Sequence, residues 1–285
     1  MALRMLRYGL RHRVRGASRV TFLLARHLPS LQAVPIPVGD AVVWMDLRTQ
    51  FAHYYLAAAP CAANFFEPAA MDAFASLVRP GDVFFDVGAN HGWFSVLAAT
   101  LGASQIHAFE PQPDVAVLLR RTLAPFDGTV HELALSDQNG AADLFVPDVA
   151  VMAGLRDWVT AQGRGMGVRR SSCQTRRLDD LQLPRPDIMK VDVEGAERLV
   201  FDGARATLDR EDAPIVVFEA ASASAAGYHE AQYAARDLLL LFTAPDWTTR
   251  YVRADGGWDN RPPHDDALVT VVAVPRARAG RLPML

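Results

Sequence analysis

The hydrophobic pattern changes at about residue 78, where short apolar runs begin to alternate with segments of helical period. Short, largely apolar runs at 83–87, 105–109 and 187–193 are typical of strands buried on both faces, as is the run at 267–274, which has no polar alternation. We also expect strands at 129–135, 143–146, 214–219 and 267–274, and helices at 93–101, 114–123, 196–208 and 230–242. Strands separated by helices predict an α/β fold whose parallel sheet is covered on both faces.

Residues 34–47 have a different pattern, that of a small hairpin with its turn at Gly39-Asp40. We expect this hairpin to cap the main domain. The chain therefore divides into a basic helical extension at 1–33, a cap at 34–77 and an α/β domain at 78–285. Within that domain, residues 148–172 are rich in Gly, Met and Arg without a clear period, and we expect them to form a mobile lid.

Charge is distributed unevenly along the chain. Residues 1–28 contain seven arginines, two histidines and no acidic residue, whereas the rest of the chain contains 22 arginines and lysines against 32 acids. In a helix, one side would carry Arg4, Arg7, Arg11, Arg15 and Arg19. Such a helix suits the surface of an anionic membrane. The alternatives are packing on the acidic body, packing on a partner subunit, or no fixed position.

The sequence predicts a cytoplasmic protein, with peripheral contact at the inner membrane as the open alternative. The longest apolar run of the extension, residues 20–25, is too short for a secretory signal or a membrane span. Cys61 and Cys173 form neither a CxxC pair nor a disulfide framework. We expect no nucleic-acid partner, because aromatic and basic residues are not interleaved. The oligomeric state stays open.

A glycine turn follows the first strand of the α/β domain. Residues 86–92 read Asp-Val-Gly-Ala-Asn-His-Gly, so the strand ends in an acid and two glycines lead into a helix. Such a turn lets backbone N–H groups and a helix N-terminus approach a carboxylate or a phosphate. Glu110 ends the next strand, at the spacing from which an acid reaches the hydroxyls of a ribose. These features together predict a nucleoside site.

Two kinds of nucleoside ligand compete for this site. A nicotinamide or flavin dinucleotide favours G-x-G-x-x-G, but Asn90 stands where the second glycine would be. A ligand that ends in an amino acid fits better, because Asp86 attracts an ammonium group while backbone N–H groups bind a carboxylate. S-adenosylmethionine is such a ligand. An NAD(P)-dependent Rossmann oxidoreductase remains the rival enzyme class.

Three further motifs follow the glycine turn in order: Glu-Pro-Gln-Pro at 110–113, Ala-Leu-Ser-Asp at 134–137 and Lys-Val-Asp-Val-Glu-Gly-Ala-Glu at 190–197. With them, the chain resembles the FkbM-type methyltransferases over roughly residues 78–220. The resemblance implies an S-adenosylmethionine-dependent enzyme with a Rossmann-like class I fold and a mostly parallel seven-stranded sheet. It also implies methylation of a hydroxyl on a carbohydrate, a glycolipid or a natural product.

Site roles follow from the same resemblance. At the methionine end of the cofactor it places Asp86, Gly88, Ala89, Asn90 and Gly92. The ribose is assigned to Glu110, and the adenine to Ser136 and Asp137.

The only lysine of the chain lies in the strand expected at 187–193. Because side chains alternate along a strand, Lys190, Asp192 and, if the strand extends that far, Glu194 project towards one side, at the carboxyl end where ligands bind. A lysine in a central strand must be paired. We expect Asp192 to be its partner, with Glu194 or Glu219 as alternatives.

Methyl transfer to a hydroxyl requires alignment of the oxygen and removal of its proton. We predict that Asp192 lies nearest to the methyl group and the acceptor oxygen, and that Lys190 orients Asp192 or polarises the acceptor. Glu194 or Glu219 is the alternative base. Two other interpretations stay open, namely a purely structural salt bridge and a divalent metal held by Asp192 and Glu219, although no metal site is predicted. The non-enzyme alternative is an inactive nucleoside-binding module.

Overall fold

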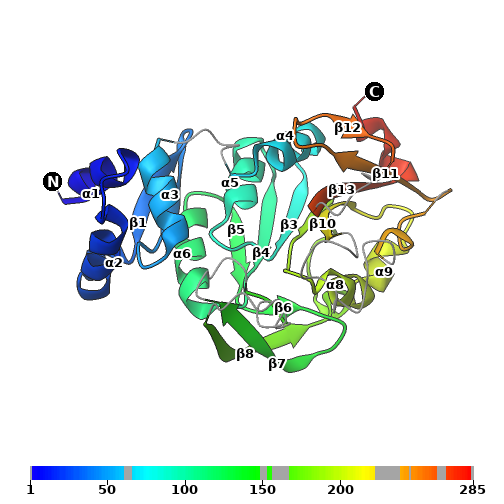
Figure 1. Cartoon of the computed structure of the whole chain (residues 1–285). Coiled ribbons are helices and arrows are strands. Elements are labelled where there is room, and N and C mark those ends of the chain that lie inside the picture. The colour runs from blue at the N-terminus through cyan, green and yellow to red at the C-terminus, as the bar shows by residue number, and fades with distance from the viewer. Residues whose placement is uncertain are drawn as a thin grey trace.

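The central sheet of the computed structural model contains eight strands. They are β3 (Val83–Val87), β4 (Gln105–Phe109), β5 (Gly128–His131), β9 (Ile188–Val191), β10 (Ile215–Ala221), β11 (Trp247–Val252), β12 (Trp258–Asp259) and β13 (Leu268–Pro275). Their order is β12-β11-β13-β10-β9-β3-β4-β5 (Figure 1). The structure describes residues 2–60, 66–147, 153–155, 167–221, 238–243, 245–261 and 268–283.

The five strands from β10 to β5 are parallel, while β13, β11 and β12 pair antiparallel with their neighbours. The predicted α/β fold with a mostly parallel sheet is therefore confirmed, although the sheet has eight strands and not the expected seven. The chain runs outward from β3 through β4 to β5, and then returns to continue from β9 to β10 on the other side. Ligands bind at such a switch point, beyond the carboxyl ends of the strands. The polar edge strands β11 and β12 were not predicted, because they lack a continuous apolar run.

Helices cover both faces of the sheet. One face carries α4 (Pro68–Leu77), α5 (Trp93–Thr100) and α6 (Pro113–Leu123), and the other carries α8 (Glu197–Gly203) and α9 (Arg205–Leu208). Successive strand residues such as Phe84 and Phe85 enter opposite cores, as strand alternation requires. The helix expected at 196–208 is wrong in one respect: it is interrupted at Ala204, next to Gly203, since glycine is a poor helix former.

A second, three-stranded sheet contains β6 (Ala134–Leu135), β7 (Gly140–Pro147) and β8 (Val168–Arg176). The single strand expected at 129–135 is wrong, because the chain turns after His131 and β5 and β6 join different sheets. The expected lid at 148–172 is also wrong at its end, since 168–172 belong to β8. Residues 148–152 and 156–166 of that lid, and 230–237 of the last expected helix, lie outside the described residues.

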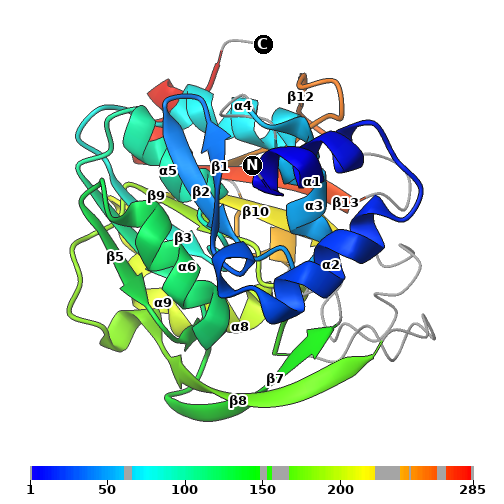
Figure 2. The ribbon, with the colours of Figure 1, turned by 90° about the vertical axis from the view of Figure 1, so that its left-hand side faces the viewer.

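The hairpin expected at 34–47 is confirmed as β1 (Val34–Val38) and β2 (Ala41–Met45). It packs over α5 and α6, and the Trp44 amide donates a hydrogen bond to the Thr122 hydroxyl at 3.0 Å. The helix α3 (Gln50–Ala58) follows. Figure 2 shows α3 beside the hairpin and the two N-terminal helices.

The basic segment forms two helices, α1 (Ala2–Arg11) and α2 (Ala17–His27), rather than one. Between them, Arg13 and Gly16 adopt left-handed conformations with φ values of 51° and 83°. Left-handed residues end a right-handed helix. The arginines on 1–28 consequently do not follow one continuous helical side.

Arginines close the amino ends of the central strands. From the final 3₁₀ helix, η4 (Arg276–Arg281), Arg281 donates two hydrogen bonds to the buried Asp82 carboxylate at 2.6 and 2.8 Å. Arg278 donates one hydrogen bond to the Asp187 carboxylate at 2.8 Å. Asp187 also accepts a hydrogen bond from the amide of Val83 at 2.9 Å. The amino ends of β3 and β9 are thus fastened together, which leaves the opposite edge of the sheet for a site.

We predict that Arg281→Met lowers the free energy of unfolding by about 3 kcal/mol, because it leaves the Asp82 carboxylate buried without its cation. Urea denaturation followed by circular dichroism measures the change. Arg276→Met is the matched control, because Arg276 is exposed on the same 3₁₀ helix. Equal stability of the two variants would contradict the structural role of this ion pair.

Candidate functional site

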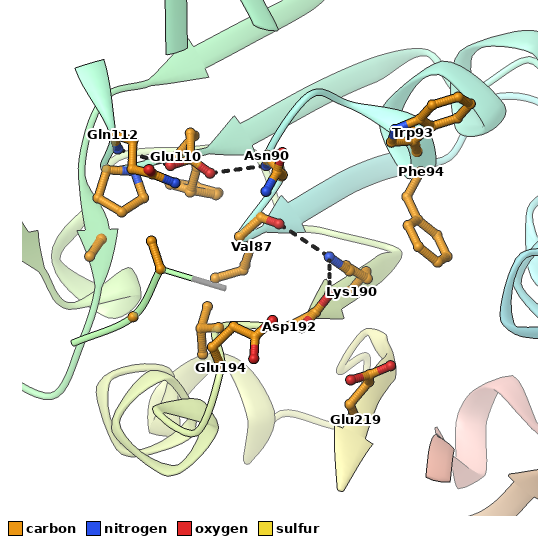
Figure 3. A pocket seen from close by; sticks show the side chains of 18 of the residues that line it. Val87, Asn90, Trp93, Phe94, Glu110, Gln112, Lys190, Asp192, Glu194 and Glu219 are labelled. Atoms are coloured by element: carbon orange, nitrogen blue, oxygen red, sulfur yellow. Dashed lines mark hydrogen bonds and ion pairs between the residues drawn. The ribbon is translucent and has the colours of Figure 1, made fainter. Parts of the chain in front are cut away.

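The carboxyl ends of β3, β4, β9 and β10 open on a cavity of about 430 Å³, a volume typical of small-molecule sites. The glycine turn and β4 contribute Val87, Gly88, Ala89, Asn90, Phe109, Glu110, Pro111 and Gln112 to its lining. The second half of the α/β domain contributes Lys190, Asp192, Val193, Glu194, Ala196 and Glu219. Figure 3 shows these two groups facing each other. The sequence prediction that they share one edge of the sheet is confirmed.

The glycine turn packs directly against the end of β9. A Cβ atom on Gly88, whose φ is 75°, would lie 1.9 Å from the carbonyl oxygen of Asp192, so no larger residue fits. The amides of Gly88 and Ala89 both donate to the carbonyl oxygen of Phe109 at 3.0 Å. These two N–H groups therefore bond within the protein, and a ligand carboxylate would need other donors. The place of Gly88 and Ala89 at the methionine end of a cofactor stays a prediction.

Glu110 joins the glycine turn to the segment after β4. Its Oε2 accepts a hydrogen bond from the Asn90 amide at 3.0 Å, and its Oε1 accepts one from the Gln112 amide at 2.8 Å. Burial raises the pKa of Glu110 to about 7 even though these hydrogen bonds oppose the shift. The Gln112 side chain also bonds to Glu110. A carboxylate has four lone pairs, so the three bonds within the protein leave capacity to accept from one hydroxyl of a ligand.

Lys190 holds the glycine turn and the end of β9 together. Its ammonium group donates to the carbonyl oxygen of Gly88 at 3.2 Å and lies 3.1 Å from the carboxylate of Asp192 (Figure 3). The carboxylate of Asp86 is 3.8 Å away on the buried side. The predicted pairing with Asp192 is confirmed, and Asp86 is a second partner that the sequence did not reveal.

The protonated state of Lys190 depends on these carboxylates. Burial alone would lower the pKa of Lys190, but the charge of Asp192 and of the other nearby carboxylates outweighs burial and raises the pKa above its ordinary value. The ammonium also lies 5.2 Å from the centre of the Phe94 ring. A compact ammonium reaches all of these groups from one point, which a planar guanidinium does not.

Asp86 lies behind the cavity rather than in its lining. Its side chain is 1% exposed, and its Oδ2 accepts a hydrogen bond from the Ser95 hydroxyl at 2.6 Å. Burial raises the pKa of Asp86, while the charge of Lys190 opposes the shift. Asp86 therefore positions Lys190, and its predicted contact with a ligand ammonium would have to pass through other groups.

Three other predicted cofactor residues also lie outside the lining. Gly92 packs against Leu119, where a Cβ atom would approach that side chain to 2.7 Å. Ser136 donates to Asp137 at 3.1 Å, and the adjoining residues Ala134 and Leu135 line the cavity in their place. The contacts of Gly92, Ser136 and Asp137 with a cofactor stay predictions.

Glu194 reaches the cavity through a turn and not through strand alternation. The strand β9 ends at Val191, and Glu194 has a left-handed φ of 55°. The carboxylate of Glu197 holds this turn, because its Oε1 accepts from the amides of Val193 and Gly195 at 3.2 and 3.1 Å. The positive φ is consequently stabilised by the helix that follows.

Glu194 and Glu219 complete the acidic side of the site (Figure 3). Burial, together with the neighbouring Asp192 carboxylate, raises the pKa of each well above its ordinary value. Both groups are therefore better proton acceptors than an ordinary glutamate once they are ionised.

Sequence reasoning missed Glu67, which precedes α4 and lines the same cavity. Its φ of 42° is left-handed. Desolvation of its carboxylate, and to a smaller extent the charge of Asp192, raises the pKa of Glu67 to about 7. The signal available was the Glu67-Pro68 pair, which marks a helix start. Nothing in that pair indicates a cavity, because this segment precedes every recognised motif.

An aromatic cluster, formed by three residues of the cap and one of α5, was also missed. It contains Phe51, Tyr55, Phe66 and Trp93, all of which line the cavity. The rings of Phe66 and Trp93 stack at 17° with centroids 5.8 Å apart, and Tyr55 lies 4.5 Å from Trp93. Flat apolar rings beside carboxylates suit a ligand that has both an apolar face and hydroxyl groups.

Acidic side chains outnumber basic ones in the described lining. Lys190 is the single cation there, against the carboxylates of Glu67, Glu110, Asp192, Glu194 and Glu219. This arrangement favours a positively charged ligand over an anionic one. Within the described residues, no group of three or more histidine, cysteine, aspartate or glutamate side chains is arranged to hold a metal ion.

One protein family matches more than half of the chain. The family described as the methyltransferase FkbM domain matches residues 86–242. That region contains the glycine turn, Glu110, Lys190, Asp192 and Glu219. It leaves out the cap, with Glu67 and most of the aromatic cluster.

Three curated relatives share part of their sequence with the chain. The 31-O-demethyl-FK506 methyltransferase FkbM of Streptomyces tacrolimicus is 41% identical over 81 residues, which cover 27% of this chain and 31% of the relative. The 2-O-methyltransferase NoeI of Sinorhizobium fredii is 30% identical over 47% of this chain and 62% of the relative. The hexuronic acid methyltransferase AglP of Haloferax volcanii is 29% identical over 49% and 56%. The chain thus spans less than two thirds of the length of each.

Among solved structures, the methyltransferase FkbM of Methylobacillus flagellatus KT is similar with a TM-score of 0.42 and 15% identity, over 78% of this chain and 52% of that one. The family match alone includes more than half of the residues of this chain. The chain belongs to the methyltransferase FkbM family.

Proposed function

We propose that the protein is an S-adenosylmethionine-dependent O-methyltransferase, and that its acceptor is a hydroxyl of a carbohydrate, a glycolipid or a natural product. One observation carries this proposal: the residues expected to bind a nucleoside and the Lys190–Asp192 pair open into the same cavity. Two of the relatives are named for transfer to oxygen and one for a hexuronic acid, which supports this class of acceptor.

The described residues fit the proposed cofactor. Glu110 accepts hydroxyl hydrogen bonds, as a ribose requires. Near it, an apolar part of the lining suited to an adenine ring contains Phe109, Leu133, Leu135 and Leu144. The acidic lining suits the ammonium and sulfonium charges. When bound, S-adenosylmethionine supplies a methyl group on positively charged sulfur.

Asp192 and Lys190 are proposed to align the acceptor. Lys190 fixes the Asp192 carboxylate from the protein side at 3.1 Å, so Asp192 is held in one orientation and accepts a hydrogen bond from the acceptor hydroxyl. Correct alignment of reacting groups contributes about 7–11 kcal/mol to barrier reduction, more than proton removal does. A loss of Asp192 should accordingly reduce turnover more than binding.

Asp192 is also the proposed acceptor of the hydroxyl proton. Glu219 and Glu194 are the alternative bases, and the structure adds Glu67 as a third. A base is most effective when its pKa lies near the working pH, which the raised pKa values of these glutamates favour. The pH dependence of turnover in single glutamine variants distinguishes them.

The proposal also includes a cytoplasmic location with peripheral contact at an anionic membrane. Two other functions predict different results. An NAD(P)-dependent oxidoreductase would bind NADH, and an inactive module would bind the sulfur nucleosides without transferring a methyl group.

We predict transfer of radiolabel from methyl-labelled S-adenosylmethionine to a glycan or glycolipid extract, together with a product that is heavier by about 14 Da per methyl group in mass spectrometry. Calorimetry should detect S-adenosylhomocysteine binding and no NADH binding. Binding without any transfer would support the inactive module. Saturable NADH binding with no binding of S-adenosylhomocysteine would contradict the proposal.

Glu110→Gln should weaken S-adenosylhomocysteine binding about 10- to 100-fold, because it removes charge-assisted hydrogen bonds to the ribose. For the wild type, binding should weaken as the pH falls below about 7, since the raised pKa of Glu110 adds a proton to the carboxylate there. The variant should lack most of this dependence. Calorimetry across pH 5.5–8.5 measures both effects, and the exposed Glu132→Gln is the control. Unchanged affinity of Glu110→Gln at high pH would remove Glu110 from the ribose site.

Asp192→Asn should lower kcat by about 10²- to 10⁴-fold, because the amide neither accepts the proton nor forms the ion pair with Lys190. The affinity for S-adenosylhomocysteine should change less than about threefold, since the ribose contacts remain. Initial rates with the labelled acceptor and calorimetry measure the two quantities. Asp202→Asn on α8 is the control. A turnover within tenfold of the wild type would transfer the catalytic role to Glu219, Glu194 or Glu67.

A further inference from the structure

The helix α2 attaches to the protein by small side chains and exposes its large ones. Its only buried residues are Thr21 and Ala25, which are four positions apart and so lie on one side. Its exposed apolar residues are Val20, Phe22, Leu23 and Leu24, with exposed fractions of 51, 39, 50 and 39%. A surface helix of a water-soluble protein normally packs such side chains inward. The arrangement in α2 is the reverse.

Exposed apolar side chains are concentrated in this part of the molecule. Of the eleven large hydrophobic residues that are exposed within the described chain, eight lie between Met5 and Leu28. We call residues 5–28 the docking surface. Figure 2 shows its two helices, α1 and α2, on one side of the protein, next to α3. Such a concentration marks an interaction surface, whereas scattered exposed residues do not.

The charge of the docking surface identifies the kind of partner. No acidic residue precedes Asp40, and exposed arginines such as Arg15, Arg19 and Arg26 lie among the apolar side chains. Arginines mixed with leucine and aromatic residues suit the headgroup region of an anionic bilayer, where the cations meet lipid phosphates and the apolar side chains enter the acyl boundary. None of the described helices is long and apolar enough to cross a membrane.

The docking surface adjoins the cavity. An open groove between the α1–α2 turn and α3 is lined by Arg11, Arg13, His53 and Tyr54, among others. Tyr54, which is 59% exposed, lines the main cavity as well. The contact between α2 and α3 is specific, because the Ser18 hydroxyl and the His53 Nδ1 atom are 2.8 Å apart while His53 Nε2 bonds to the Leu47 carbonyl. The docking surface is thus held at a fixed position beside the site.

We propose that α1 and α2 dock the protein on an anionic lipid bilayer and bring the cavity to the membrane surface. The acceptor is then a membrane-borne glycolipid whose hydroxylated headgroup enters the cavity past Tyr54. This second statement rests on the proposed methyl transfer, whereas the docking itself does not.

The test of docking is sedimentation of the full chain with vesicles of phosphatidylcholine alone, or with 30 mol% phosphatidylglycerol added. The protein should bind the anionic vesicles, and 0.5 M salt should weaken binding. Arg15→Glu/Arg19→Glu should lower the partition coefficient by about 30-fold or more, since each arginine near an anionic surface contributes about fivefold. Phe22→Ser/Leu23→Ser should lower it by about tenfold or more.

Control variants make these outcomes specific. Val117→Ser removes an exposed apolar side chain from α6, and Arg276→Glu reverses a charge on η4; both should bind vesicles as the wild type does. All variants should keep the wild-type affinity for S-adenosylhomocysteine, which reports that the site is folded. Absence of wild-type binding to anionic vesicles, or equal binding by every variant, would overturn the proposal. A dimer that Phe22→Ser/Leu23→Ser dissociates in sedimentation velocity would also overturn it and assign the surface to a second copy of the chain.

The acceptor class has a separate test. After incubation of the enzyme with a membrane fraction and labelled S-adenosylmethionine, the label should enter the chloroform-extractable lipids. Label found only in the water-soluble fraction would contradict a glycolipid acceptor while leaving methyl transfer supported. Complete absence of label would instead count against the proposed function, and vesicle binding would be unaffected by either result.

Discussion

The site depends on one buried ammonium group. Lys190 bonds to the carbonyl oxygen of Gly88 and to the carboxylate of Asp192, and it faces Asp86 from the cavity side. Two strands that are distant in sequence are thereby tied at the edge where ligands bind, while arginines tie the same strands at the other edge. The ammonium stays charged because carboxylates surround it, and those carboxylates tolerate burial because the ammonium is present. The geometry of the cavity edge and its local stability therefore depend on the same group.

The cavity has two sides with different origins in the sequence. The side expected to bind the nucleoside comes from residues 86–135, within the family match, whereas the aromatic side comes mainly from α3 and the turn before α4. Glu67 connects them, since its carboxylate belongs to the cap but its pKa responds to Asp192 and Lys190. The family match therefore includes the side expected to bind the nucleoside, whereas most of the aromatic side lies outside the matched region.

Continuous apolar strands and the motifs at their ends were predictable from the sequence, because burial and strand-end geometry are local properties. Val83–Val87 and Gln105–Phe109 were found with the correct bounds, and the pairing of Lys190 with Asp192 follows from strand alternation. Features that depend on tertiary contacts were not predictable. The turn at Glu194 is held by hydrogen bonds to the Glu197 carboxylate, and the Gly88 amide donates to the carbonyl oxygen of Phe109. Glu67 lines the cavity because the cap packs over α5. Polar edge strands such as Trp258–Asp259 are not predictable from their own sequence, because pairing with a neighbouring strand and not an apolar run makes them strands.

The separate origin of the aromatic side has an evolutionary consequence. The aromatic residues of the cap and Glu67 are encoded before the region that matches the family. Recombination between related genes near codon 78 would exchange this segment for another without interrupting the strand order of the α/β domain. If the cap selects the acceptor of the proposed methyl transfer, a single crossover would give a lineage new methylated products and leave the side expected to bind the nucleoside unchanged.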